Sequence, residues 1–129
     1  LVSNQLDEDL TLYYQQYTIR FDGAVYHDVR SLYLANQQHE FKVCLTGEKQ
    51  GDTYHLTGYH VPIIFSQSVF EVVSSGCKDA TLVSMHSHPY KHCVFSEKDI
   101  ISYHREQYYN PDVLLGLMCT LDRFTFYRE

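Results

Sequence analysis

The segment ATLVSMHSHPYKHCVFSEKDIISYHREQYY (residues 80–109) decides the fold of this chain. Its first nine residues have strand character and stop at Pro89, because proline cannot continue the hydrogen-bond ladder of a sheet. From Ser96, a preferred helix N-cap residue, a helical pattern runs to the Asn110-Pro111 pair, which closes it. The segment therefore predicts a strand, a loop and a helix in succession.

Comparable patterns on both sides extend this unit into one domain. Turn signals separate short apolar runs, and the runs before and after residues 48–52 are expected to pair as antiparallel neighbours. We expect an α/β fold, a single-domain mixed β-sheet flanked by two or three helices over residues 17–129, preceded by a polar arm or short helix at residues 1–16. The expected strands are 17–21, 40–47, 53–62, 80–88, 112–120 and 123–129, and the expected helices are 26–38, 66–78 and 96–109.

Composition argues against two classes of partner. The net charge of −6 disfavours nucleic acid, because binding it needs a basic face that displaces counterions. No apolar run approaches the roughly 20 residues that span a bilayer, so we expect no membrane segment. The chain begins with Leu1 and lacks the pattern of a signal peptide, so we expect a domain of a longer protein.

The four cysteines form no CxxC pair, so a structural zinc knuckle is not supported. Most of them fall within apolar runs, where a buried thiol behaves as a small hydrophobic residue. This favours a reducing, cytoplasmic location. A disulfide between Cys93 and Cys119 stays open as an exception, since sequence alone does not decide it.

Two histidines at the end of the predicted strand form a candidate metal site. His86 and His88 are two positions apart, so both imidazoles point to the same face of the sheet. Asp99 lies in the first turn of the next helix, and the seven-residue loop before Ser96 is long enough to bring that turn back to the histidines. A His/His/Asp set with an open fourth position is typical of catalytic zinc. A second interpretation stays open, because Ser96 and Asp99 also match the S-x-x-[DE] capping box of an ordinary helix.

A hydrolytic zinc site also needs a general base that does not itself bind the metal. Glu40 is the best candidate, because a carboxylate at the edge of an apolar strand can lie against the histidines of a neighbouring strand. Partial desolvation there would raise its pKa. Glu48 and Glu71 are weaker candidates, since they fall in a predicted turn and a predicted exposed helix.

These residues resemble the signature of the JAMM (MPN+) metalloprotease family. The string HSHP, six further residues and SEKD match its His-x-His-Pro, loop and Ser-x-x-Asp motif. HEFKVCLTG is similar to the glutamate-bearing first strand of the family. The resemblance covers about residues 17–127 and implies the cytidine-deaminase-like JAMM/MPN architecture.

The resemblance also implies a role for each matched residue. His86, His88 and Asp99 would bind one zinc ion per chain. Glu40 would act as general base, and Ser96 would donate a hydrogen bond to the oxyanion.

The activity that the resemblance implies is that of a zinc-dependent isopeptidase or peptidase, which cleaves after the C-terminal tail of ubiquitin or of a ubiquitin-like or sulfur-carrier protein. Only 30 residues follow Asp99, too few for the long second insertion of the eukaryotic enzymes that act on polyubiquitin, so the chain resembles the compact prokaryotic type. The extended tail is expected to lie beside an exposed strand, in contact with Tyr90 and Lys91.

Two alternative functions stay open. One is a non-catalytic scaffold domain of the same fold that mediates protein–protein interactions. The other is a zinc hydrolase that acts on a small cysteine or amino-acid adduct. The oligomeric state is not predicted.

Overall fold

The computed structural model describes residues 8–89 and 92–129, and within these ranges the chain forms nine strands and two helices. In sequence order they are β1 (Leu10–Tyr14), β2 (Tyr17–Phe21), α1 (Gly23–Ala35), β3 (Lys42–Gln50), β4 (Thr53–His60), β5 (Ile64–Gln67), β6 (Val72–Ser74), β7 (Val83–Ser87), α2 (Glu97–Tyr109), β8 (Leu114–Thr120) and β9 (Arg123–Tyr127).

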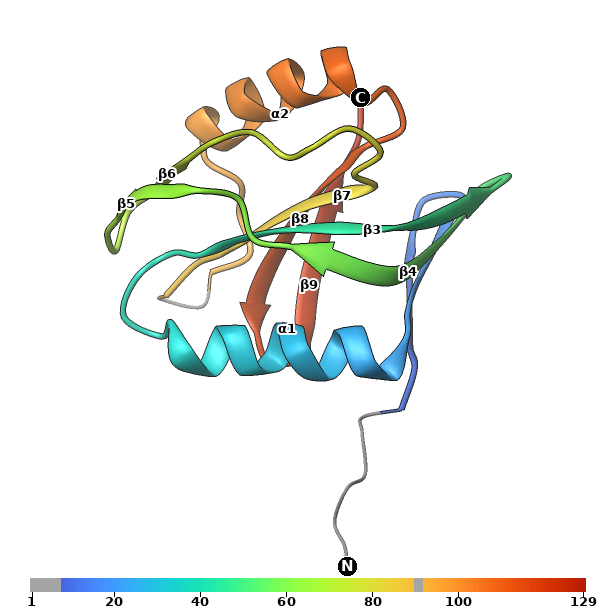
Figure 1. The fold of residues 1–129 in the computed structure, drawn as a ribbon, viewed down its shortest axis with the longest axis horizontal. Coiled ribbons are helices and arrows are strands. Elements are labelled where there is room, and N and C mark those ends of the chain that lie inside the picture. The colour runs from blue at the N-terminus through green and yellow to red at the C-terminus, as the bar shows by residue number, and fades with distance from the viewer. Residues whose placement is uncertain (1–7, 90–91) are drawn as a thin grey trace, which may run out of the picture.

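Seven strands form one sheet in the order β1-β2-β4-β3-β7-β8-β9. The pairs β2–β4 and β7–β8 are parallel and the other neighbours are antiparallel, so the sheet is mixed. The sheet curves until its ends meet, since the Arg128 amide donates to the Tyr14 hydroxyl over 3.2 Å. The two helices cover opposite faces (Figure 1). The expected α/β class, a mixed sheet with flanking helices, is confirmed.

The two faces of the sheet are buried to different extents. Val25, Val29 and Tyr33 recur every fourth residue on α1, so they form one buried stripe against the larger core. On the other face, Tyr103 is the one buried residue of α2, and it packs with Val113 and Leu115. Because α2 covers its face less completely, room for a groove is left beside it.

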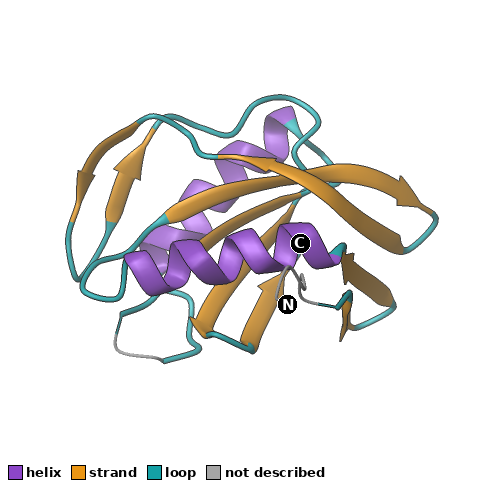
Figure 2. Ribbon diagram, turned by 60° about the horizontal axis from the view of Figure 1, so that its bottom comes forward, coloured by secondary structure: helices purple, strands orange, loops and turns teal. Residues whose placement is uncertain are grey.

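The helix expected at residues 66–78 is wrong. This part of the chain contains β5 and β6, which pair as an antiparallel hairpin in a separate small sheet (Figure 2). Ser68 lies between the two strands. Its amide donates to the Glu71 carbonyl over 2.9 Å, and its hydroxyl accepts from the amides of Phe70 and Glu71. These bonds close a turn, and the β-branched pair Val72-Val73 then favours a strand.

Two further boundaries differ from the expectation. Within the predicted arm at residues 1–16, β1 is an edge strand that pairs with β2 along its whole length. Leu10, Leu12 and Tyr14 alternate toward the core, a period of two that places them in the sheet. The first helix begins at Gly23, three residues earlier than expected, and the Gly23 amide donates to Asp9 Oδ1 over 2.8 Å.

The expectation of buried free thiols is wrong for Cys44 and Cys77. The structure pairs Cys44 with Cys77 and Cys93 with Cys119, with Cα–Cα distances of 5.7 and 5.3 Å. The pairing left open for Cys93 is therefore present. Disulfides are typical of proteins in oxidising compartments, so the cysteines do not support the expected cytoplasmic location. Among the described residues, neither helix is long and apolar enough to cross a membrane.

Candidate metal centre

The end of β7 places two imidazoles on one face of the sheet. His86 lies in β7 between its neighbours β3 and β8. His88 is the first residue after β7, and its amide extends the hydrogen-bond ladder between β7 and β8 by donating to the Met118 carbonyl over 3.4 Å. Both side chains are buried, and their ring centroids lie 5.0 Å apart.

Asp99 reaches both histidines from the first turn of α2. Its Oδ2 atom lies 3.2 Å from His86 Nε2 and 3.6 Å from His88 Nε2. The same carboxylate accepts the Ser96 amide over 2.8 Å, while Ser96 Oγ accepts the Asp99 amide over 3.1 Å. The capping box is therefore present, and it turns the Asp99 carboxylate toward the histidines. The two interpretations of Ser96 and Asp99 are compatible.

Glu40 is fixed between the small hairpin and β7. Its amide donates to the Ser68 carbonyl over 2.8 Å, and its carbonyl accepts from the Gln67 side chain over 2.9 Å. The next residue, Phe41, exchanges hydrogen bonds with Ser87. These contacts bury the Glu40 carboxylate with its Oε2 atom 3.9 Å from His88 Nε2. The structure thus places Glu40, and neither Glu48 nor Glu71, against the histidines.

The distances distinguish between two possible sets of metal ligands. Ligand atoms of Glu40, His86 and His88 all lie within 4.8 Å of one another, so this buried group could hold a metal ion. Two atoms that are each about 2.0–2.1 Å from a tetrahedral zinc ion lie roughly 3.3 Å apart. The separations of 3.2 and 3.6 Å from Asp99 match this edge, while the 3.9 Å from Glu40 is longer. Glu40 and Asp99 thus both lie near the two histidine Nε2 atoms, and the separations from Asp99 are the closer to this edge.

The hydrogen bonding of the histidines also fits a metal. His86 Nε2 is buried and has no hydrogen-bond partner among the described residues. His88 Nδ1 lies 3.3 Å from the His92 carbonyl, which can only accept, so Nδ1 carries the hydrogen of a neutral ring. Its Nε2 atom then offers a lone pair toward the site. This arrangement, a ligand imidazole oriented through its other nitrogen, is common around protein-bound metals.

The carboxylates and His88 have pKa values shifted by burial and by one another. Burial raises the pKa of Glu40 to about 7, although the neighbouring His88 opposes the shift. Burial acts against the charged form of His88, but the neighbouring carboxylates of Asp99 and Glu40 raise its pKa. Burial also acts against the charged form of Asp99, yet the two histidines beside its carboxylate hold its pKa below the usual range.

Metal-free protein is expected to lose stability as pH rises through 7, and Glu40 is one cause. The folded state raises the pKa of Glu40 from 4.5 to about 7. The stabilisation of the folded state by protonated Glu40 is therefore fully present below pH 4.5 and is lost as pH rises through 7. Glu40→Gln removes this titration. The variant should gain up to about 3 kcal/mol over wild type at pH 8, with no gain at pH 4. Urea unfolding with a chelator at both pH values measures this. Glu48→Gln, at an exposed position, is the control. If the free energy of unfolding depends on pH equally in wild type and Glu40→Gln, the raised pKa of Glu40 is wrong.

A disulfide anchors the loop that connects the histidines with α2. Cys93 is joined to Cys119 at the end of β8. Cys93 directly follows His92, whose carbonyl accepts the hydrogen of the His88 ring. The disulfide therefore holds the group that orients one of the proposed ligands.

Replacing Cys93 and Cys119 together by serine should weaken zinc binding about 10-fold or more, because His88 loses its oriented partner. It should also lower the free energy of unfolding by about 2–4 kcal/mol. Removing Cys44 and Cys77 is the matched control, since it deletes a disulfide with a similar sequence separation, 33 against 26 residues, away from this loop. Competition titration with a zinc chelator measures both variants. Equal losses of zinc affinity would show that the Cys93 disulfide acts through stability alone.

Among the remaining predicted residues, Ser96 is exposed at the start of α2 and is held by the capping bonds. Tyr90 and Lys91 lie outside the described residues. Sequence reasoning missed the His92 carbonyl, because a backbone group leaves no signal in residue identity. It also missed Lys42 and Glu106, which form an ion pair between the sheet and α2.

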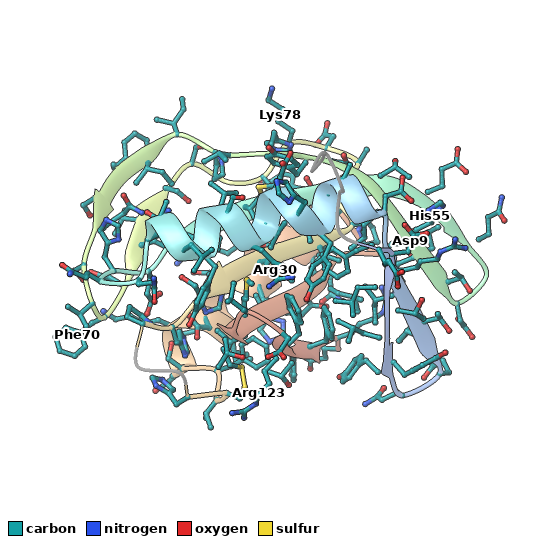
Figure 3. The ribbon with its side chains drawn as sticks, turned by 90° about the horizontal axis from the view of Figure 1, so that it is seen from below. Asp9, Arg30, His55, Phe70, Lys78 and Arg123 are labelled. Carbon is teal, nitrogen blue, oxygen red and sulfur yellow. A yellow bond between two sulfur atoms is a disulfide. The ribbon has the colours of Figure 1, made fainter. Side chains whose placement is uncertain are left out.

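The candidate metal centre lies at a groove of about 430 Å³ between α2 and strand β6 of the β5–β6 hairpin. Glu40, His86 and Asp99 line the groove, while Val72–Ser74 of β6 and Ile101 of α2 form parts of its walls. An exposed ion pair, Lys98 to Glu71 at 3.5 Å, joins the two walls. Figure 3 shows Phe70 projecting outward at the end of this hairpin, where it is 84% exposed.

Comparison of the sequence with protein-family models and with curated proteins found no match.

Proposed function

We propose that this protein is a zinc-dependent peptidase or isopeptidase of the JAMM type, with the JAMM/MPN architecture. Its substrate would be the C-terminal tail of ubiquitin or of a ubiquitin-like or sulfur-carrier protein. The observation that carries the proposal is the spacing of Asp99 Oδ2 from the two histidine Nε2 atoms, 3.2 and 3.6 Å, with the Glu40 carboxylate just beyond that set. An intact ligand set beside an open groove favours an enzyme over a scaffold domain.

Each residue of the centre has a distinct task. His86, His88 and Asp99 would hold the zinc ion, since nitrogen and carboxylate ligands suit zinc. When bound, zinc supplies Lewis acidity that polarises a carbonyl group and makes water more acidic. Glu40 has a pKa of about 7, so both of its protonation states are available near neutral pH. It can take a proton from the attacking water at Oε2 and deliver it to the leaving amine.

Ser96 is suited to stabilise the negative charge that develops on the scissile carbonyl oxygen. Its hydroxyl oxygen accepts the Asp99 amide, so its own hydrogen remains free to be donated. Because the capping box fixes this hydroxyl, the donor is oriented before substrate arrives. A preorganised donor of this kind is commonly worth about 3 kcal/mol in the transition state.

The groove is suited to an extended peptide. Among residues 8–89 and 92–129, β6 pairs only with β5, and residues 72–74 of β6 line the groove. A strand edge of this kind can accept a further strand through backbone hydrogen bonds. A flexible tail could therefore lie between β6 and α2 with its scissile bond at the metal centre.

The test is incubation of zinc-loaded protein with a panel of ubiquitin-like proteins that carry C-terminal fusions. Cleavage at the end of the ubiquitin-like tail is expected, and a chelator should abolish it. Purified protein that holds zinc but cleaves no fusion would favour the scaffold function. Cleavage of short adducts without cleavage of protein fusions would favour the small-molecule hydrolase.

A further inference from the structure

A second ion pair lies in the groove and is not used by the proposed chemistry. Lys42 of β3 pairs with Glu106 of α2, and their side chains are only 15% and 11% exposed. Lys42 stands directly opposite His86 in the β3–β7 register. Both members of the pair line the groove, which also contains the metal centre.

The pair presents an unused donor and an unused acceptor. Glu106 uses Oε1 to accept from Lys42, while its Oε2 atom is buried without a hydrogen bond among the described residues. A lysine ammonium group has three N–H donors, so this bond leaves two of them. A buried ion pair is a weak source of stability, because both charges lose their hydration. Stability alone therefore does not explain why two charged residues are buried in this groove.

A peptide backbone offers the complementary groups. In an extended peptide, the N–H and C=O of one residue point to the same side, which is how strands exchange paired hydrogen bonds. The Lys42 ammonium can donate to such a carbonyl, while the Glu106 carboxylate, which lines the groove and has an oxygen without a partner among the described residues, can turn to accept the N–H of the same residue. The pair thus suits recognition of the backbone and is indifferent to the side chain.

The position of the pair indicates which residue of a substrate it would contact. Glu106 follows Asp99 by seven residues on α2, so it lies about 10 Å further along the helix. An extended peptide advances about 3.3 Å per residue. A peptide that follows α2 from the metal centre therefore passes the pair with about its third residue from the scissile bond.

We propose that Lys42 and Glu106 are specificity-determining residues that bind the backbone carbonyl and amide of the third tail residue before the scissile bond. This inference rests on the proposed function for the location of the scissile bond. It requires a free N–H at that position, so tails with proline or an N-methylated residue there are poor ligands, whereas changes of side chain are tolerated.

The test uses binding, so that it does not depend on turnover. The probe is a fluorescein-labelled eight-residue peptide that copies the C-terminal tail of ubiquitin, titrated by fluorescence anisotropy with zinc-loaded Glu40→Gln protein. A series of peptides carries one N-methyl group at each of the last five residues. Methylation of the third residue should weaken binding about tenfold.

The comparison protein carries Lys42→Met and Glu106→Leu on the same Glu40→Gln background. Replacing both charges together avoids leaving one charge buried alone, so the fold is expected to survive. This protein should bind the unmodified peptide about tenfold more weakly. It should show no further loss when the third residue is methylated.

The outcomes separate this inference from the proposed function. An equal methylation penalty in both proteins, or no binding of the unmodified peptide, overturns the inference. A loss of affinity on methylation that occurs only when Lys42 and Glu106 are present supports the inference. This holds even if the protein with Glu40 intact cleaves no tail. Cleavage without such a penalty leaves the proposed function standing and removes this role for Lys42 and Glu106.

Discussion

Replacing Glu40 with glutamine should lower kcat for tail cleavage by about 10²–10⁴-fold while one zinc ion stays bound per protein molecule. The amide has nearly the same shape as the carboxyl group but cannot accept a proton. The ligands His86, His88 and Asp99 do not change, so zinc affinity should stay close to that of wild type. Single-turnover cleavage of a ubiquitin-like fusion, with zinc measured in the same sample, gives both quantities.

Glu71→Gln is the matched control for this prediction. Glu71 lines the same groove and contributes to the raised pKa of Glu40, but its side chain is 50% exposed and pairs with Lys98. Its replacement should change kcat by less than about tenfold, because an exposed ion pair contributes little. A similar loss of activity in both variants would show that general negative charge, and not proton transfer by Glu40, supports catalysis.

Replacing Asp99 with asparagine should weaken zinc binding at least 100-fold and abolish cleavage. The substitution removes the negative charge that lies 3.2 and 3.6 Å from the two histidine Nε2 atoms. The asparagine side-chain oxygen can still accept the Ser96 amide, so the capping box loses little. Isothermal titration with zinc, together with thermal unfolding of metal-free protein, separates the two roles of this residue.

Glu97→Gln provides the control for helix electrostatics. Glu97 is the other acidic residue in the first turn of α2, and it is exposed. Its loss should lower stability by about 0.3–1 kcal/mol through the helix dipole, with zinc affinity unchanged. If Asp99→Asn also keeps its zinc affinity and loses only stability, Asp99 is a capping residue and not a ligand.

The strand, loop and helix around the candidate site could be predicted because local signals decide them. Pro89 follows the strand closely, Ser96 starts a helix and Pro111 prevents its continuation, and the structure has the corresponding elements β7 and α2. The proximity of His86, His88 and Asp99 was also foreseeable. Residues two apart on a strand share a face, and a short loop returns the helix start to that face.

What could not be predicted depends on contacts between distant residues. The hairpin of β5 and β6 begins as a serine-rich segment that could also start a helix, and the bonds from residues 67 and 68 to Glu40 tie it to the site. The disulfides join residues 26 and 33 positions apart, a pairing that sequence spacing does not reveal. Lys42 and Glu106 are 64 positions apart in the sequence. The residues around Lys42 in its strand do not indicate that it pairs with a buried carboxylate.

The central claim is that one zinc ion is bound by His86, His88 and Asp99 while Glu40 stands outside the ligand shell. Zinc K-edge X-ray absorption of the loaded protein and of its Glu40→Gln variant tests this most directly. Both spectra should show about four nitrogen or oxygen ligands near 2.0–2.1 Å, including two imidazoles, with no difference between the proteins. A shell that loses a ligand in Glu40→Gln, or a protein that retains no zinc, would contradict the claim.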